Sequence, residues 1–313
     1  MTNSSPLRFT CVWEDHLAGP TPQDWMNAVA RANGLGADQL QLNSSAGFAG
    51  LRHHSLLIPS ARSTTREERA DWVRDIEADL GLDYLAVAAT TGEMALRGPA
   101  LVVMDADSTL FTGEGIDMIA EKAGTQDEVA AITASAMRGE LDFAESLRAR
   151  MGTLAGLSVS VLDEVREVYD FSPGASDMVE AFHRYGIKIG VVSGGFMEIV
   201  EPKAESIGID YVLANRFEIE DGRLTGRPLG EIVTGESKEA ALVRWTDELG
   251  VSTDLCVAMG DGANDIKMIR RAGIGIAYMA KPALREAADA RIPFPNLAAG
   301  ADLTGPTSTL INR

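Results

Sequence analysis

The chain has 313 residues, of which 45% are hydrophobic and 24% charged, and its formal net charge at pH 7 is −18. This length favours about two domains with separate cores, whereas the negative charge argues against a nucleic-acid or anionic-membrane partner. No apolar run approaches the ~18 residues of a membrane helix, and the N-terminal MTNSSPLRFT lacks a signal-peptide pattern, so we expect a cytoplasmic protein.

The first 95 residues predict a small α+β domain. Apolar alternation and helical periodicity predict strand, helix, two strands, helix and strand, in that order, at residues 7–13, 22–32, 39–42, 54–58, 66–80 and 84–89. Thr64 and Thr65 precede the run REER and supply a helix start, and Gly81 supplies a stop. This βαββαβ order predicts an ACT-like or ferredoxin-like fold. Residues 90–100, which include Gly98-Pro99, are the best linker candidate.

Residues 96–313 predict a doubly wound α/β domain. Short apolar strands alternate with helical segments, and we place these strands at residues 101–104, 188–192, 211–214, 255–259 and 274–277. The stretch between the first two strands is much longer than a crossover needs. It therefore predicts an inserted helical cap over about residues 115–168. Asp221-Gly222 predicts a tight hairpin, and Pro202 predicts a kink or break in the helix around it.

Two aspartates directly follow the first apolar strand of this domain, in the sequence ALVVMDADST. Asp105 and Asp107 are two residues apart, a pattern that on its own arises by chance about once in a chain of this length. Other strands and helices carry further polar motifs: SGG at 193–195, GESK ending in Lys238, and GDGAND at 260–265. SGG and GESK could each be ordinary turns or caps. Together the four motifs favour a ligand site, because ligands bind at the carboxyl ends of parallel strands.

The residue types at these positions suit phosphate chemistry. Asp105, Asp261 and Asp265 offer hard oxygen atoms, as ligands or supporting groups, for Mg²⁺. The Ser193 hydroxyl, the Gly194 amide and the Lys238 ammonium can bind phosphate oxygens. One carboxylate of the Asp105–Asp107 pair could attack phosphorus while the other transfers a proton.

DADST, SGG, Lys238 and GDGAND resemble the four motifs of the haloacid dehalogenase superfamily. Residues 104–282 resemble its phosphoserine phosphatase family in particular, through TGEGIDMIA, AMRGELDFAESLRARM and VVSGGF. The resemblance implies a Rossmann-like parallel sheet with a helical cap. It also implies that Asp105 is the nucleophile and Asp107 the acid/base. Mg²⁺ would be held by Asp105, the Asp107 backbone carbonyl and Asp261, with Asp265 supporting the site.

The resemblance further implies a binding role for eight residues. Ser193, Gly194, Lys238 and Asn264 would bind or lie close to the phosphate. In the cap, the resemblance assigns the substrate ammonium to Glu114, its carboxylate to Arg150, and the pocket lining to Met137 and Phe143. The implied partner is a small molecule, O-phospho-L-serine, and the implied role is the last step of serine biosynthesis.

Two other hypotheses remain open. The protein could be a phosphatase or phosphotransferase for another small amino-alcohol phosphate. It could also be a catalytically silent sensor of serine or phosphoserine, which would require a missing chemical group, and none is missing. The sequence leaves the oligomeric state open, a homodimer included, together with the effector of the N-terminal domain and the cause of the acidity.

Overall fold

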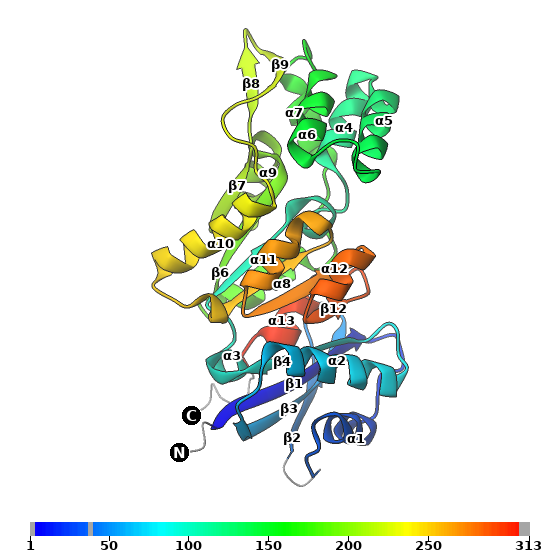
Figure 1. The fold of residues 1–313 in the computed structure, drawn as a ribbon, viewed down its shortest axis with the longest axis vertical. Coiled ribbons are helices and arrows are strands. Elements are labelled where there is room, and N and C mark those ends of the chain that lie inside the picture. The colour runs from blue at the N-terminus through cyan, green and yellow to red at the C-terminus, as the bar shows by residue number, and fades with distance from the viewer. Residues whose placement is uncertain (1–3, 37–39, 307–313) are drawn as a thin grey trace.

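A computed structural model describes residues 4–36 and 40–306 of the chain (Figure 1). Its N-terminal part contains a four-stranded antiparallel sheet of order β2-β3-β1-β4. The strands and the helices α1 and α2 follow the predicted βαββαβ order: β1 (Ser4–Glu14), α1 (Pro22–Asn33), β2 (Gln41–Ala46), β3 (Leu51–Arg62), α2 (Arg66–Leu80) and β4 (Ala86–Thr91). The strand predicted at 39–42 begins at Gln39, which lies outside the described residues. The ACT-like assignment stays a prediction.

Local sequence signals set the ends of α2. The Thr65 hydroxyl accepts from the Glu68 amide at 3.1 Å, and the Glu68 carboxylate accepts from the Thr65 amide at 2.9 Å. This capping box satisfies two donors that the first turn leaves free. Gly81 ends the helix in the left-handed region with φ 62°, where glycine carries little steric cost.

Within the described residues, a second sheet has six parallel strands in the order β12-β11-β10-β5-β6-β7. The strands are β5 (Leu101–Met104), β6 (Lys188–Phe196), β7 (Tyr211–Asn215), β10 (Cys256–Gly260), β11 (Ile274–Tyr278) and β12 (Ala290–Ile292). Five of them confirm predicted strands. Sequence reasoning missed β12, whose three residues are too few to show a pattern.

Helices cover both faces of the parallel sheet. Val102 and Met104 of β5 pack into one core with residues of α8 (Ala175–His183) and α13 (Ala299–Thr304). Leu101 and Val103 point the other way and pack against α10, α11 and α12, which span Gly235–Leu249, Ile266–Arg271 and Pro282–Ala287. Burial on both faces explains why β5 is a continuous apolar run.

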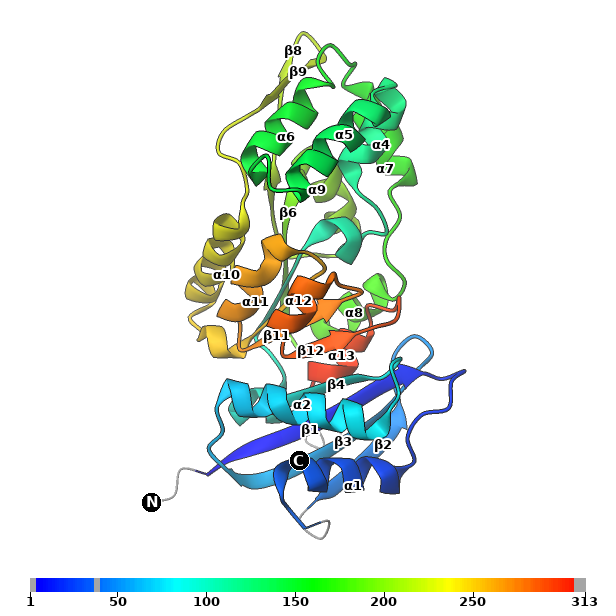
Figure 2. The same cartoon turned by 45° about the vertical axis from the view of Figure 1, so that its right-hand side comes forward.

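Four helices lie together beyond the carboxyl ends of the parallel strands, at the end of the molecule opposite the N-terminal sheet (Figures 1 and 2). They are α4 (Gly115–Ala123), α5 (Gln126–Met137), α6 (Phe143–Gly152) and α7 (Ser160–Val168). We propose that they form the cap predicted over about residues 115–168. The predicted hairpin, β8 (Phe217–Glu220) and β9 (Arg223–Pro228), turns at Asp221-Gly222, where both residues have positive φ.

Two local predictions are wrong. The segment 90–100 is not an irregular linker, because β4 runs to Thr91 and α3 (Gly92–Arg97) follows at once. A domain boundary near residue 95 therefore stays a proposal. The break predicted at Pro202 is also wrong, since α9 (Met197–Ser206) continues through it, and the alternative of a kink stays a prediction. Proline removes only one N–H and its ring can be accommodated within a helix when tertiary packing supports the turn.

The N-terminal sheet packs directly on the second part of the chain. Helices α1 and α2 cover one face of the sheet. On the other face, Val12, Leu51 and Ala88 share a core with Leu303 of α13. Figure 2 shows α13 lying against this sheet. Arg66 at the start of α2 reaches Asp289 with two nitrogens at 2.7 and 2.5 Å. Apolar burial and a bidentate ion pair thus join the two parts.

This shared core predicts that the two parts unfold together. Leu51 is 2% exposed, so Leu51→Ala should lower the free energy of unfolding of the whole chain by about 2–5 kcal/mol. Urea unfolding followed by circular dichroism measures this loss. Leu229→Ala is the control because Leu229 is 56% exposed. Two separate transitions, with only the first one shifted, would show that the interface does not couple the parts.

Candidate active site

The predicted site residues meet at the carboxyl edge of the parallel sheet. Asp105 follows β5, Ser193 and Gly194 lie near the end of β6, and Asp261 follows β10. These strands are neighbours in the order β10-β5-β6. Parallel neighbours end at the same edge, and this edge is where α/β sheets bind ligands.

Asp105 is buried beside a lysine. Its Oδ2 lies 2.7 Å from Nζ of Lys238, and its Oδ1 accepts from the Ala106 amide at 2.7 Å. Lys238 also lies 2.7 Å from Oδ1 of Asp265. Burial raises the pKa of Asp105 well above its usual value, and the negative charge of Asp265 adds to this, while Lys238 opposes it. Burial disfavours the Lys238 ammonium, but Asp105 and Asp265 outweigh it and raise the pKa of Lys238.

Three carboxylates form an acidic cluster. Asp105, Asp261 and Asp265 each offer an oxygen within 4.8 Å of the others. Burial raises the pKa of Asp261, and the charge of Asp265 adds to this, while Lys281 opposes it. Both oxygens of Asp265 have partners already, because Oδ1 meets Lys238 and Oδ2 accepts from the Gly262 amide at 3.1 Å. The donor set therefore fits a hard divalent cation, with Asp265 placed to support it.

Asp107 is held by three donors. Its Oδ1 accepts from the Tyr169 hydroxyl at 2.5 Å and from the Gly115 amide at 2.8 Å. Its Oδ2 accepts from the Ser193 hydroxyl at 3.2 Å. The side chain thus lies between the segment that returns from the four-helix group and the end of β6.

The end of β6 lies close to Asp107. A Cβ at Gly195 would lie 2.6 Å from Oδ2 of Asp107, so a larger residue would displace the carboxylate. Asn215 fixes this end of the strand, because its side chain donates to the Gly194 carbonyl at 2.8 Å and accepts from the Val233 amide at 2.8 Å. Asn264 is half-buried in the short turn Ala263–Asp265 that follows β10.

The cap residues fall into two groups. Glu114 precedes α4 and accepts from the Ser108 hydroxyl at 3.2 Å; burial, with the charges of Asp107 and Asp261, raises its pKa to about 7. Burial lowers the pKa of Arg150, and Glu114 is the strongest charge opposing this. The buried Nε of Arg150 has no hydrogen-bond partner among the described residues. The Phe143 ring lies against the end of β6, 2.8 Å from where a Gly194 Cβ would be. Met137, by contrast, is 81% exposed at the end of α5.

Sequence reasoning missed three residues of the site. Tyr169 and Asn215 donate to the site from outside its motifs, and Lys281 lies 3.1 Å from Oδ2 of Asp261 with a side chain that is 65% exposed. Nothing in the local sequence marks any of them. Lys281 follows β11 at the same sheet edge, and that position is the one signal that could have drawn attention to it.

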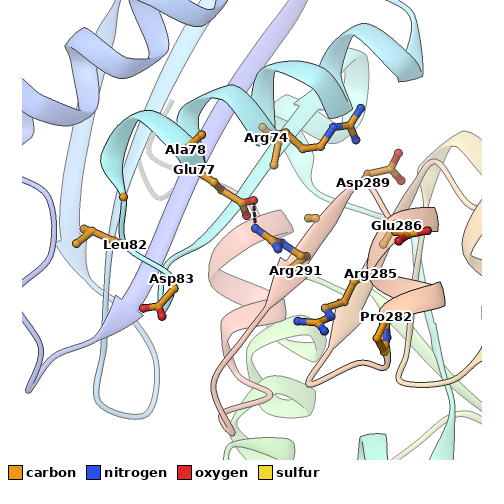
Figure 3. A pocket seen from close by; sticks show the side chains of 14 residues that line it. Arg74, Glu77, Ala78, Leu82, Asp83, Pro282, Arg285, Glu286, Asp289 and Arg291 are labelled. Atoms are coloured by element: carbon orange, nitrogen blue, oxygen red, sulfur yellow. Dashed lines mark hydrogen bonds and ion pairs between the residues drawn. The ribbon is translucent and has the colours of Figure 1, made fainter.

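A cavity of about 840 Å³ lies away from this site, between α2 and the segment from α12 to β12 (Figure 3). Glu77 of α2 points across it to an ion pair with Arg291 of β12. None of the predicted site residues lines it. We therefore place the candidate active site at the sheet edge, because the carboxylates cluster there, and do not choose it by the size of a cavity. Among the described residues, every helix is too short or too polar to cross a membrane.

Known proteins resemble this chain over most of its length. The family model for haloacid dehalogenase-like hydrolases matches residues 102–270. Phosphoserine phosphatase SerB2 of Mycobacterium tuberculosis is 50% identical over 215 residues, which cover 69% of this chain and 53% of that protein. A phosphoserine phosphatase of Streptococcus thermophilus is 50% identical over 197 residues, which cover 63% of this chain and 92% of that protein. This chain spans about half the length, 53%, of the first two curated relatives that it matches.

Solved structures agree in fold. An HAD family hydrolase from Salmonella enterica superposes with a TM-score of 0.78 at 26% identity, covering 95% of this chain and 98% of that one. A substrate-bound phosphoserine phosphatase superposes with a TM-score of 0.61 at 38% identity, covering 65% of this chain and 97% of that one. The first match therefore extends over nearly the whole chain, and the second over about two thirds of it.

Proposed function

Because the chain belongs to the haloacid dehalogenase-like hydrolases, and within them to the phosphoserine phosphatase family, we propose that it hydrolyses O-phospho-L-serine to L-serine and phosphate. One observation carries the choice of substrate. Glu114 and Arg150 offer an acid and a guanidinium that are both half-buried, and the buried Nε of Arg150 has no hydrogen-bond partner among the described residues. Phosphoserine carries an ammonium and a carboxylate at the end remote from phosphorus, so this pair suits it. With this function we also propose that the partner is a small molecule, that the protein is cytoplasmic, and that the reaction is the last step of serine biosynthesis.

The proposed reaction has two steps. A carboxylate oxygen of Asp105 attacks phosphorus and forms an O–P bond, while the bond from phosphorus to the serine oxygen breaks. The leaving alkoxide takes a proton from the Asp107 carboxyl group. Asp107 then accepts a proton from water as the water attacks the aspartyl phosphate, which releases inorganic phosphate and restores Asp105.

Three binding groups would hold the phosphate during both steps. Lys238, the Ser193 hydroxyl and the Gly194 amide lie around Asp105 and Asp107, and Asn264 lies on the neighbouring turn. Lys238 supplies a fixed positive charge, and its contact with Asp265 keeps it in place. These groups are set before substrate arrives, so they need little rearrangement as charge develops.

We propose Mg²⁺ as the cation at the acidic cluster. Asp105, the Asp107 backbone carbonyl and Asp261 would hold it, with Asp265 as support. Such an ion would screen the repulsion among the carboxylates and draw charge from the phosphate oxygens. The oxygen-only donor set and the raised pKa values of Asp105 and Asp261 support this choice.

Two narrower alternatives are less well supported. A phosphatase for another amino-alcohol phosphate would need the ammonium-binding acid but not Arg150. A silent sensor would lack a catalytic group, whereas Asp105, Asp107 and Lys238, the proposed nucleophile, acid/base and phosphate-binding lysine, are all present at one edge of the sheet.

A substrate panel tests the choice of substrate. Arg150→Ala and Glu114→Ala each remove a charged hydrogen bond, worth about 1.5–3 kcal/mol. Each change should therefore lower kcat/KM for phosphoserine by roughly 10- to 100-fold. Neither should much affect an aryl phosphate, which has no ammonium or carboxylate to lose.

Arg148→Ala is the matched control, because Arg148 is exposed on the same helix. It should leave activity on both substrates unchanged. The substrate assignment is wrong if the wild-type protein prefers an ester without an amino-acid end. It is also wrong if both cap variants lose aryl phosphatase activity as fully as phosphoserine activity.

A further inference from the structure

We propose that Tyr169 is a positioning residue that orients the acid/base Asp107, so that Oδ2 is the oxygen that gives and takes the proton. This inference rests on the proposed function and adds to it a group that lies outside the four motifs. It is carried by the contacts of one buried hydroxyl and by the segment on which that hydroxyl sits.

The Tyr169 hydroxyl is committed to Asp107. The residue is 1% exposed. Its hydroxyl oxygen lies 2.5 Å from Oδ1 of Asp107 and 3.5 Å from the Gly113 carbonyl oxygen, and it has a single hydrogen to donate. The shorter contact is therefore the hydrogen bond, with Tyr169 as donor. A carboxylate acceptor makes this bond stronger than one between neutral groups.

The two oxygens of Asp107 differ in their surroundings. Oδ1 already accepts two hydrogens, from Tyr169 and from the Gly115 amide. A proton on Oδ1 would point at one of these donors. Oδ2 has one donor among the described residues, the Ser193 hydroxyl at 3.2 Å, and lies beside the end of β6 that would bind phosphate. Oδ2 is thus the oxygen free to carry the proton, on the side where the ester oxygen would lie.

Packing holds the Tyr169 ring in place. It stacks on Phe111 with centroids 4.2 Å apart and an angle of 23° between the rings. Phe111 pairs with Phe171 in an antiparallel bridge, and the Thr112 amide donates to the Asp170 carbonyl at 3.0 Å. These contacts join the outgoing and returning connections of the four-helix group, since Tyr169 directly follows α7. The position of the hydroxyl is therefore tied to the place where that group meets the sheet.

Tyr169→Phe removes the hydroxyl and keeps the stacked ring. Loss of one hydrogen bond to a charged group should lower kcat for phosphoserine by roughly 10- to 100-fold. KM should stay within about threefold, because Tyr169 makes no contact with the proposed substrate groups. Tyr84→Phe is the control: it also removes a tyrosine hydroxyl that donates a hydrogen bond, here an exposed one to the Ala18 carbonyl at 2.7 Å in the N-terminal part.

Leaving-group dependence separates positioning from a structural role. A serine alkoxide needs the Asp107 proton to leave, whereas an aryl oxide with low basicity needs it much less. In the first turnover, Tyr169→Phe should therefore slow release of serine strongly and release of the aryl alcohol by no more than about threefold. Phe111→Leu keeps the hydroxyl but loosens its stack, and it should show the same leaving-group pattern with a smaller loss.

Each outcome decides between the hypotheses. Equal kcat for phosphoserine in wild type and Tyr169→Phe, both folded by circular dichroism, overturns the role of Tyr169 alone. So does an equal loss with both leaving groups. If the wild-type protein hydrolyses no phosphomonoester, the proposed function fails, and the inference fails with it.

Discussion

Asp105→Asn should abolish phosphatase turnover while the protein stays folded. An amide is a poor nucleophile toward phosphorus, so the covalent step is lost rather than slowed. Removal of a covalent nucleophile elsewhere costs roughly 10⁶-fold in kcat, and we expect a loss of at least about 10⁴-fold here. The measurement is steady-state release of phosphate from phosphoserine by wild type and variant at equal concentration.

The fold should tolerate this change. Asp105 is buried beside Asp265, and its carboxylate is disfavoured there by burial and by that neighbouring charge. The amide relieves the repulsion, although Lys238 then keeps only Asp265 as a charged partner. The thermal unfolding temperature of Asp105→Asn should therefore be close to that of the wild-type protein. Asp247→Asn, on the exposed face of α10, is the matched control and should stay fully active. Normal turnover by folded Asp105→Asn protein would rule out Asp105 as the nucleophile.

Removal of divalent metal should have the second large effect. Chelation should lower activity by at least about 10³-fold, because the crowded carboxylates at Asp105, Asp261 and Asp265 would repel a phosphate dianion. Mg²⁺ should restore activity. Ca²⁺ should inhibit, since it takes six to eight oxygens at longer and looser distances and would misplace the Asp105 carboxylate.

The metal series has a clear control. Lys238 and Lys281 each pair with cluster carboxylates, so the chelated protein should stay folded, and circular dichroism checks this. Full activity after chelation, or full activity in Ca²⁺ alone, would contradict an octahedral site built on Asp105 and Asp261.

Sequence reasoning located the parallel sheet and the edge that carries the site. Strands buried on both faces are continuous apolar runs, so β5 and β10 stand out in the sequence, and the aspartates that follow them are placed by strand order alone. The hairpin at Asp221-Gly222 and the start of α2 at Thr65 were predictable because their signals lie within a few residues.

What sequence reasoning missed depends on contacts between distant segments. Tyr169 and Asp107 are 62 residues apart, and an ordinary tyrosine after an amphipathic helix carries no mark of its partner. That Leu51 shares a core with Leu303 of α13 was missed for a similar reason: an alternating strand shows that a face is buried, not what buries it. The exposure of Met137 depends on how α5 lies relative to the sheet, which no local pattern fixes.

In the proposed mechanism, Asp105 becomes transiently phosphorylated during each turnover. The most direct measurement is rapid acid quenching of wild-type protein with ³²P-labelled phosphoserine, followed by peptide mapping of the label. The account predicts a hydroxylamine-sensitive phosphate on the peptide that contains Asp105, formed within the first turnover and absent from Asp105→Asn. Label on another residue, or turnover with no labelled protein at any time, would contradict it.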